Sequence, residues 1–133
     1  MDSINKYEEA PLIELEDFKC PEGAKGFFIT GFDNKKLRVA IWNINSDKGT
    51  IILQSGRTEF IEKYYEVIEG FISRGYCVAA MDWRGQGLSE RTSKNIRLGH
   101  IDDFEEYDKD LIKTLGLYET LCPKPWIGFG HSM

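Results

Sequence analysis

Cysteine and histidine are scarce in this chain of 133 residues, which holds three of the first and two of the second. The three cysteines, Cys20, Cys77 and Cys122, are an odd number and lie far apart in the sequence, so they predict neither a disulfide framework nor a zinc site. A reducing compartment fits this pattern best. No apolar run approaches the roughly 18 residues that a membrane span needs. The N-terminus also lacks the basic start and apolar core of a secretory signal. We therefore expect a cytoplasmic protein with no transmembrane segment.

Basic residues are outnumbered by acidic ones, 17 against 22, so the net charge is -5 and the isoelectric point is near 5.1. Nucleic-acid binding needs Lys and Arg to neutralise phosphates, and this balance argues against it. The hydrophobic share of 41% and the charged share of 29% are typical of globular proteins and exclude a disordered or collagen-like chain. The length supports one domain with a real core.

The apolar pattern predicts an α/β fold. Residues 1–25 are acidic, carry two prolines and read as an N-terminal arm, and residues 26–133 carry the periodic pattern of a folded domain. Apolar runs at 27–32 and 37–42 flank a turn and predict an antiparallel hairpin, with alternate residues of the second run on opposite faces. Further strands are predicted at 50–53, 76–81 and 126–129. A helical pattern lies between each pair of these strands, which indicates a parallel β-α-β-α-β arrangement after the hairpin.

Each predicted helix has an apolar stripe and signals at its ends. Thr58 can cap the first helix, and Gly75 lies where a left-handed C-terminal cap is expected. Asp102 or Asp103 can cap the second helix, and prolines follow its end. The stripe of the first helix comprises Phe60, Tyr64, Val67, Ile68 and Phe71. The stripe of the second comprises Phe104, Tyr107, Leu111, Ile112 and Leu115.

Parallel sheets place their chemistry at the carboxyl ends of the strands. The last predicted strand leads there into Gly130-His131-Ser132-Met133, which supplies four of the five positions of G-x-S-x-G. In that motif a strained turn between strand and helix exposes the serine hydroxyl, and the next N–H points into the same space. A G-x-S triplet alone is also compatible with an ordinary loop serine. The position of this triplet directly after a predicted strand favours the role of Ser132 as a nucleophile.

Several blocks in order resemble one known family. They are Gly56-Arg57-Thr58-Glu59-Phe60-Ile61-Glu62-Lys63-Tyr64, Arg74-Gly75-Tyr76-Cys77-Val78, Asp82-Trp83-Arg84-Gly85-Gln86-Gly87-Leu88-Ser89 and Gly130-His131-Ser132-Met133. Together they resemble the N-terminal half of an α/β-hydrolase of the lysophospholipase, or monoacylglycerol lipase-like, group of serine hydrolases. The resemblance runs from about residue 26 to the last residue. It implies that 26–133 is a partial α/β-hydrolase domain and that the substrates are carboxylic esters of lipids.

The resemblance also implies the roles of site residues. Ser132 would be the nucleophile, and the backbone N–H groups of Met133 and Arg57 would bind the oxyanion. Family members commonly have His-Gly where this chain has Ser55-Gly56, but a backbone donor depends little on its neighbours' side chains. The Arg57 side chain either holds its loop or meets an anionic phosphate, and the first reading is favoured.

Other candidate residues favour structural roles. Glu59 is expected to lie in the first turn of a helix, where the helix dipole favours a negative charge, rather than to transfer a proton in catalysis. Asp82 and Arg84 read as a network that organises a turn, because the triad acid of this fold follows the serine in the chain. Gly85-x-Gly87 starts a dinucleotide fingerprint, but Glu90 occupies the position of its third glycine.

The two histidines also read as structural. His131 adjoins Ser132, so the two side chains would point in different directions, and it reads as a packing residue. His100 precedes the serine, which is the wrong order for the triad base.

Acyl transfer by serine needs a base and an acid, and in the family both follow the nucleophile. The chain is therefore expected to be a truncated, inactive piece of a larger hydrolase, with an open strand edge. The expected partner is a small-molecule lipid ester, reached through a peripheral membrane contact; no nucleic acid, metal or organic cofactor is implied. The alternatives are a monoacylglycerol lipase or general carboxylesterase fragment, and a non-catalytic α/β binding domain.

Overall fold

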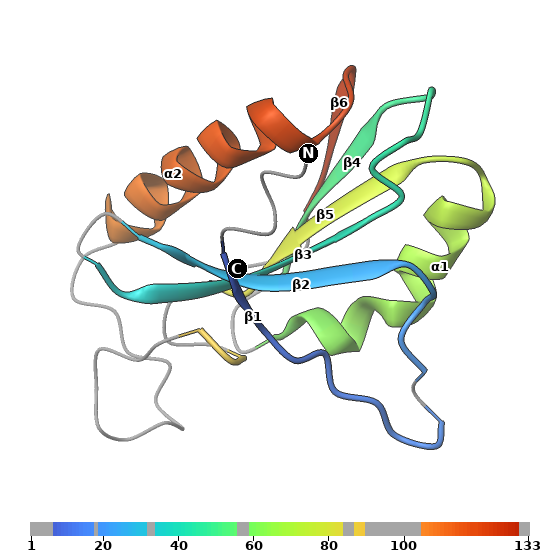
Figure 1. Ribbon diagram of the computed structural model, residues 1–133, viewed down its shortest axis with the longest axis horizontal. Coiled ribbons are helices and arrows are strands. Elements are labelled where there is room, and N and C mark those ends of the chain that lie inside the picture. Colours follow the sequence, from blue (N-terminus) through green and yellow to red (C-terminus); the bar gives the residue numbers. More distant parts are fainter. Residues whose placement is uncertain are drawn as a thin grey trace.

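The computed structural model describes residues 7–17, 19–31, 34–55, 59–83, 87–89 and 105–130. They form one six-stranded sheet with the strand order β1-β2-β3-β5-β4-β6 (Figure 1). The strands are β1 (Glu8–Glu9), β2 (Ala24–Thr30), β3 (Lys36–Trp42), β4 (Thr50–Gln54), β5 (Cys77–Met81) and β6 (Trp126–Gly130). The helices are the 3-10 helix η2 (Ile61–Tyr64), α1 (Tyr65–Ser73) and α2 (Glu105–Leu121).

The pairing of the strands confirms the predicted fold class. β2 and β3 form the expected antiparallel hairpin, in register from Ala24 opposite Trp42 to Thr30 opposite Lys36. β3 pairs antiparallel with β5, whereas β4 pairs parallel with both β5 and β6. The two parallel crossovers are the β4-α1-β5 and β5-α2-β6 connections that the sequence pattern predicts. Within the described residues, β6 lies at the open edge of the sheet, as expected.

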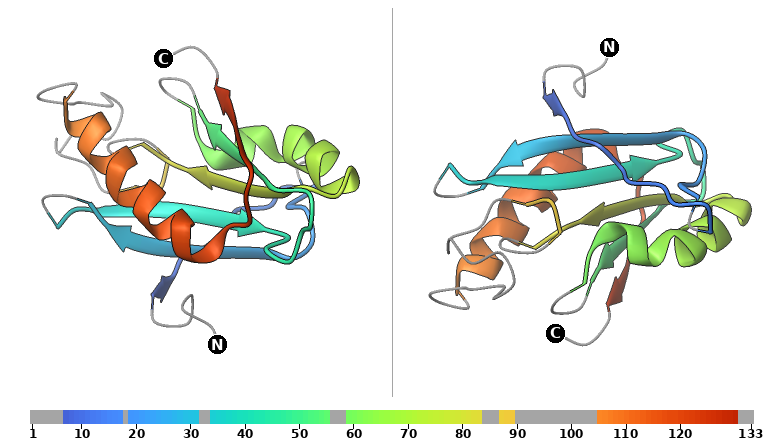
Figure 2. Two further views of the ribbon diagram at one scale, coloured as in Figure 1. Left: turned by 90° about the horizontal axis from the view of Figure 1, so that it is seen from above. Right: turned by 90° about the horizontal axis from the view of Figure 1, so that it is seen from below.

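The two α-helices cover opposite faces of the sheet (Figure 2). Leu37, Val39 and Ile41 of β3 belong to the core that includes Leu117 and Tyr118 of α2. Ala40 and Trp42, at the alternate positions, belong to the core that includes η2 and α1. β3 therefore has the alternation that its sequence predicts, with both of its faces buried.

The predicted apolar stripe of the first helix is wrong in part. Phe60 and Val67 are 43% and 37% exposed, whereas Ile61 and Tyr65, outside the predicted stripe, are buried. The segment opens with a turn of 3-10 helix, and its shorter period rotates the buried face relative to a uniform α-helix. Thr58, the predicted cap, lies outside the described residues; η2 begins at Ile61.

The predicted stripe of the second helix is likewise wrong in part, because Leu111 and Leu115 are partly buried against the core as expected but Ile112 is not. Ile112 is 68% exposed, whereas Thr114 is fully buried one turn before Leu117 and Tyr118. The Thr114 hydroxyl lies 2.8 Å from the carbonyl oxygen of Asp110, so a polar side chain is satisfied within the helix and can face the core. Phe104, the side chain of Tyr107 and the predicted caps Asp102 and Asp103 lie outside the described part.

The predicted ends of both helices are confirmed. Gly75 has a φ of 93°, and its N–H donates to the carbonyl of Ile72 at 2.9 Å, which closes α1 with a left-handed turn. α2 ends at Leu121, two residues before Pro123. The three cysteines are free thiols. No helix among the described residues is long and apolar enough to cross a membrane.

Candidate active site

The carboxyl ends of the three parallel strands lie at one edge of the sheet. Gln54, the last residue of β4, is in register with Met81 of β5 and with Gly130 of β6. The chain segments that follow these residues therefore leave the sheet at the same edge, where parallel sheets carry their functional loops. The predicted nucleophile Ser132 is two residues beyond Gly130. Among the residues with predicted roles, Ser132, Met133, Arg57, Arg84, His100 and His131 lie outside the described residues.

Asp82, directly after β5, is the centre of a buried hydrogen-bond network. Its Oδ2 accepts from the Nε of Arg38 at 2.7 Å and from the N–H of Leu88 at 2.9 Å, and its Oδ1 accepts from the N–H of Ile61 at 2.9 Å. One carboxylate thus joins strand β3, the start of η2 and the turn at 87–89. This geometry supports the prediction that Asp82 organises a turn, although the partner that the structure shows is Arg38.

Arg38 is the residue of this network that the sequence analysis missed. It lies in the apolar strand β3, and its guanidinium is fully buried. Besides Asp82, it donates to Glu62 at 2.5 and 2.6 Å and to the carbonyl of Pro11 at 2.9 Å. The single charge within the apolar run Leu37-Arg38-Val39-Ala40-Ile41-Trp42 was the available signal, because a charge in a buried strand requires a partner.

The pKa values of the two acids move in opposite directions. Burial dominates at Asp82 and raises its pKa above the ordinary value of 3.8, against the charge of Arg38. Burial also acts to raise the pKa of Glu62, but the hydrogen bonds from Arg38 and from the N–H of Ile13, with the charge of Arg38, outweigh it. The pKa of Glu62 is therefore held below its ordinary value of 4.5.

The turn at 87–89 is fastened to the sheet on both sides. The N–H of Arg38 donates to the Ser89 hydroxyl at 2.8 Å, and that hydroxyl donates to the carbonyl of Asp82 at 2.7 Å. Gly87 has a φ of 53°, and a Cβ at this position would collide with the Asp82 carboxylate. The turn therefore depends on glycine, both for its backbone conformation and for the space that the carboxylate occupies.

Two described residues, Ser55 and Glu59, lie on either side of residues 56–58 in the sequence. Ser55, directly after β4, is buried, and its hydroxyl has no hydrogen-bond partner among the described residues, while its carbonyl accepts from the Trp83 indole at 2.9 Å. Glu59 is also buried. Its carboxylate accepts a hydrogen bond from the Tyr64 hydroxyl and forms an ion pair with the Lys63 ammonium at 2.9 Å. Glu59 precedes η2 by two residues, so the predicted place in the first helical turn is wrong.

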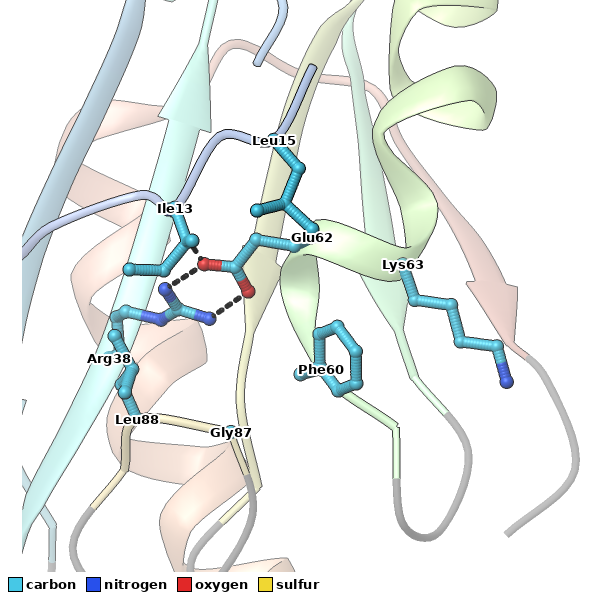
Figure 3. A pocket seen from close by; sticks show the side chains of 8 residues that line it. All are labelled: Ile13, Leu15, Arg38, Phe60, Glu62, Lys63, Gly87 and Leu88. Atoms are coloured by element: carbon cyan, nitrogen blue, oxygen red, sulfur yellow. Dashed lines mark hydrogen bonds and ion pairs between the residues drawn. The ribbon is translucent and has the colours of Figure 1, made fainter. Parts of the chain in front are cut away.

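A hollow of about 560 Å³ opens beside this network (Figure 3). The bidentate Arg38–Glu62 pair forms one wall, and the remaining lining comes from the N-terminal arm, the start of η2 and the 87–89 turn. Its lining residues are Ile13, Leu15, Arg38, Phe60, Glu62, Lys63, Gly87 and Leu88. Within the described ranges there is no group of three or more residues that could hold a metal ion.

Sequence comparison identifies the family. The model of the family described as serine aminopeptidase, S33, matches residues 45–133. The chain belongs to this family of α/β-hydrolases.

Curated relatives agree with this family. Lysophospholipase L2 of Escherichia coli is 30% identical over 97 residues, which are 73% of this chain and 28% of that protein. Monoacylglycerol lipase of Mycolicibacterium smegmatis is 32% identical over 105 residues, which are 77% of this chain and 36% of that protein. The chain thus spans about a third or less of the length of these curated relatives.

Solved structures share the fold. The structure of DcsB in complex with its substrate analogue superposes with a TM-score of 0.68 at 20% identity, covering 83% of this chain and 37% of that one. The thioesterase domain from the curacin biosynthetic pathway has a TM-score of 0.60 at 19% identity, covering 83% of this chain and 36% of that one. An epoxide hydrolase from Vigna radiata has a TM-score of 0.65 at 17% identity, covering 86% of this chain and 34% of that one. At these identities the likeness concerns the fold alone.

Proposed function

We propose that this chain carries the nucleophile side of a serine hydrolase that cleaves carboxylic esters of lysophospholipid-type substrates. The observation that carries the proposal is the shared edge of the three parallel strands: Gln54, Met81 and Gly130 are in register there, and Gly130 begins the G-x-S sequence. The family and the names of the curated relatives support the reaction class and the lipid substrate.

In this proposal Ser132 attacks the ester carbonyl carbon through its hydroxyl oxygen. The N–H groups of Arg57 and Met133 bind the oxyanion that forms on the carbonyl oxygen, because such donors stabilise charge that develops in the transition state. The alcohol then leaves, and water hydrolyses the acyl-enzyme to release the fatty acid. The buried Asp82 network supports this arrangement indirectly, since it anchors the start of η2 and the 87–89 turn beside the same edge.

The base and the acid of the triad are assigned to sequence beyond the 133 residues. Among the acids and histidines of this chain, Asp82 and Glu59 are engaged in structural contacts, and neither histidine lies within the described residues. We therefore expect the 133-residue chain to show no burst with an activated ester. A triad that lacks members retains only about 10³–10⁴-fold acceleration over water. A cytoplasmic location, a peripheral membrane contact and the division into an arm of 1–25 and a domain of 26–133 stay predictions.

The experiment compares two proteins: the 133-residue chain and the product of the same reading frame continued past residue 133. Fatty-acid release from a 1-acyl lysophospholipid is measured for both, with Ser132→Ala in the longer protein as the control. The longer protein should hydrolyse the ester, and Ser132→Ala should reduce kcat/KM by at least about 10⁴-fold. Unchanged activity in Ser132→Ala, or stoichiometric fluorophosphonate labelling of the short chain, contradicts the proposal.

A monoacylglycerol lipase is the second candidate, favoured by the 32% identity to that enzyme from Mycolicibacterium smegmatis. The two candidates differ in head group, so the same assay with a monoacylglycerol of equal chain length separates them. A higher kcat/KM for the neutral ester identifies the lipase. If the reading frame stops at residue 133 and the product folds as a stable monomer without activity, a non-catalytic binding domain is the remaining function.

A further inference from the structure

Two of the three cysteines come together in the core, although they are far apart in the sequence. Cys77 is the first residue of β5, and Cys122 directly follows α2. Both are buried, with exposed fractions of 0% and 7%, and both belong to the core on the α2 face of the sheet. Cys20, in contrast, packs against the core on the α1 face. The sheet therefore separates Cys20 from the other two thiols.

Thr50 of β4 connects the backbone segments that carry these two thiols. It is in register with Cys77, and its hydroxyl donates to the carbonyl of Pro123, the residue after Cys122, at 2.6 Å. The N–H of Cys77 donates to the carbonyl of Gly49 at 2.9 Å, and the N–H of Cys122 donates to a carbonyl of α2 at 2.8 Å. Hydrogen bonds therefore hold the backbones of both cysteines beside the same residue of β4.

The two thiols interact, and each shifts the pKa of the other. The hydrogen bond with Cys122 is the largest effect on Cys77 and lowers its pKa below the ordinary value of 9.0, against the effect of burial. The hydrogen bond with Cys77, together with burial, raises the pKa of Cys122. Cys122 thus acts as the donor and Cys77 as the acceptor, which favours the thiolate at Cys77, the reactive form of a thiol.

We propose that Cys77 and Cys122 are a site of reversible disulfide formation whose oxidant is a small hydroperoxide such as hydrogen peroxide. Two cysteines can be joined without backbone movement only where they already lie side by side, as this pair does. The burial of the pair excludes bulky oxidants, whereas hydrogen peroxide is little larger than water. The link would join the start of β5 to the end of α2, and thiol reductants would reverse it.

The reaction consumes one hydrogen peroxide for each pair. The Cys77 thiolate attacks one peroxide oxygen, the O–O bond breaks, and the other oxygen leaves with the Cys77 proton as water. The Cys122 sulfur then attacks the sulfur of the Cys77 sulfenic acid. The S–S bond forms, the S–O bond breaks, and a second water leaves with the Cys122 proton. The two sulfurs together lose two electrons, which reduce the peroxide.

The test exposes the protein to hydrogen peroxide and maps linked peptides by mass spectrometry. Cys20→Ala leaves only Cys77 and Cys122 in the 133-residue chain, and it should fold, because Cys20 is partly exposed. In this variant both thiols should disappear together, the mass should fall by two hydrogen atoms, and dithiothreitol should restore both thiols. The product of the longer reading frame is treated in parallel, and the same peptide pair is followed in it.

The wild-type chain unfolded in urea is the matched control. Loop closure depends only weakly on loop length, so in urea the three possible pairs should form within about fourfold of one another, whereas in the native chain Cys77–Cys122 should exceed each pair with Cys20 by at least about tenfold. Cys122→Ala removes the partner that closes the bond. In that variant Cys77 should give no link to Cys20, because the sheet lies between them.

Free cysteine also packs as a small apolar side chain, and the same experiment recognises that role. If native Cys77 and Cys122 keep their thiols under peroxide while the urea-unfolded chain is oxidised, the pair serves only packing and the proposal is overturned. Three other results also overturn it: sulfinic or sulfonic acid in Cys20→Ala without a link, a native preference no greater than that in urea, and a native link through Cys20.

Discussion

Replacing Arg38 by Met tests the central claim that a buried charge network holds the site edge together. The substitution keeps much of the side-chain length and removes the charge and the hydrogen bonds to Asp82, Glu62 and Pro11. Asp82 is then left as a fully buried acid without its cationic partner. Breaking a buried pair in this way costs about 3–5 kcal/mol, a large part of the roughly 5–15 kcal/mol that stabilises a typical domain.

The matched control lies two residues away on the same strand. Lys36 pairs with Glu8 at 2.7 Å, but these side chains are 55% and 57% exposed. Solvent screens such a pair, so Lys36→Met should cost no more than about 1 kcal/mol. The two substitutions each remove a cation from one strand; Arg38 is buried and contacts two acids, whereas Lys36 is exposed and pairs with Glu8.

Urea unfolding followed by tryptophan fluorescence measures both effects. With a slope near 2 kcal/mol/M, Arg38→Met should lower the midpoint by about 1.5–2.5 M, and Lys36→Met by about 0.5 M or less. The double variant Arg38→Met/Asp82→Asn should be less destabilised than the sum of its single variants, because the two residues are in contact. If Arg38→Met falls within about 1 kcal/mol of Lys36→Met, the network does not stabilise the fold and the reasoning fails.

Three further predictions follow from the same region. Gly87→Ala should lower the unfolding free energy by about 2–4 kcal/mol, because φ is positive there and the Asp82 carboxylate fills the space. Gly116→Ala, in an open part of α2, should raise the unfolding free energy slightly. Equal changes in melting temperature for the two variants would contradict this prediction. Since folding lowers the pKa of Glu62, the contribution of this carboxylate to stability is present above pH 4.5 and is lost as the pH falls. The difference in unfolding free energy between wild type and Glu62→Gln should therefore shrink from pH 6 to pH 3. A difference that widens over this range would refute the prediction. Ser55→Ala removes a hydroxyl that has no hydrogen-bond partner in the described part of the chain, and it should change the unfolding free energy by less than about 1 kcal/mol. Thr50→Val removes a donor to the Pro123 carbonyl at 2.6 Å and should lower the unfolding free energy by more than that, as measured in urea.

Much of the fold follows from local patterns in the sequence. Alternation in β3 predicts which of its residues share a face, and Gly75 marks the end of α1, because both depend on backbone preferences within a few residues. The helix faces at Phe60 and Ile112 were predicted wrongly. In the first case a 3-10 turn changed the period, and in the second a threonine that bonds its own helix replaced an apolar residue in the core.

The candidate site was predictable only in part. The sequence pattern indicates that Asp82 organises a turn, but it does not reveal that its partner is Arg38, 44 residues away. The hollow likewise joins Ile13, Phe60 and Leu88, which no motif connects. The roles of Ser132, Arg57 and Met133 stay predictions.

The sequence alone determined the order and type of the elements, the family and the edge at which chemistry is expected, because these depend on short-range periodicity and on ordered motifs. Tertiary structure decided the rest: the insertion of β5 between β3 and β4, the partners of the buried charges, and the apolar hollow beside them. These features require segments distant in the chain to meet. Their stability comes from burial and pairing that exist only once the sheet is assembled.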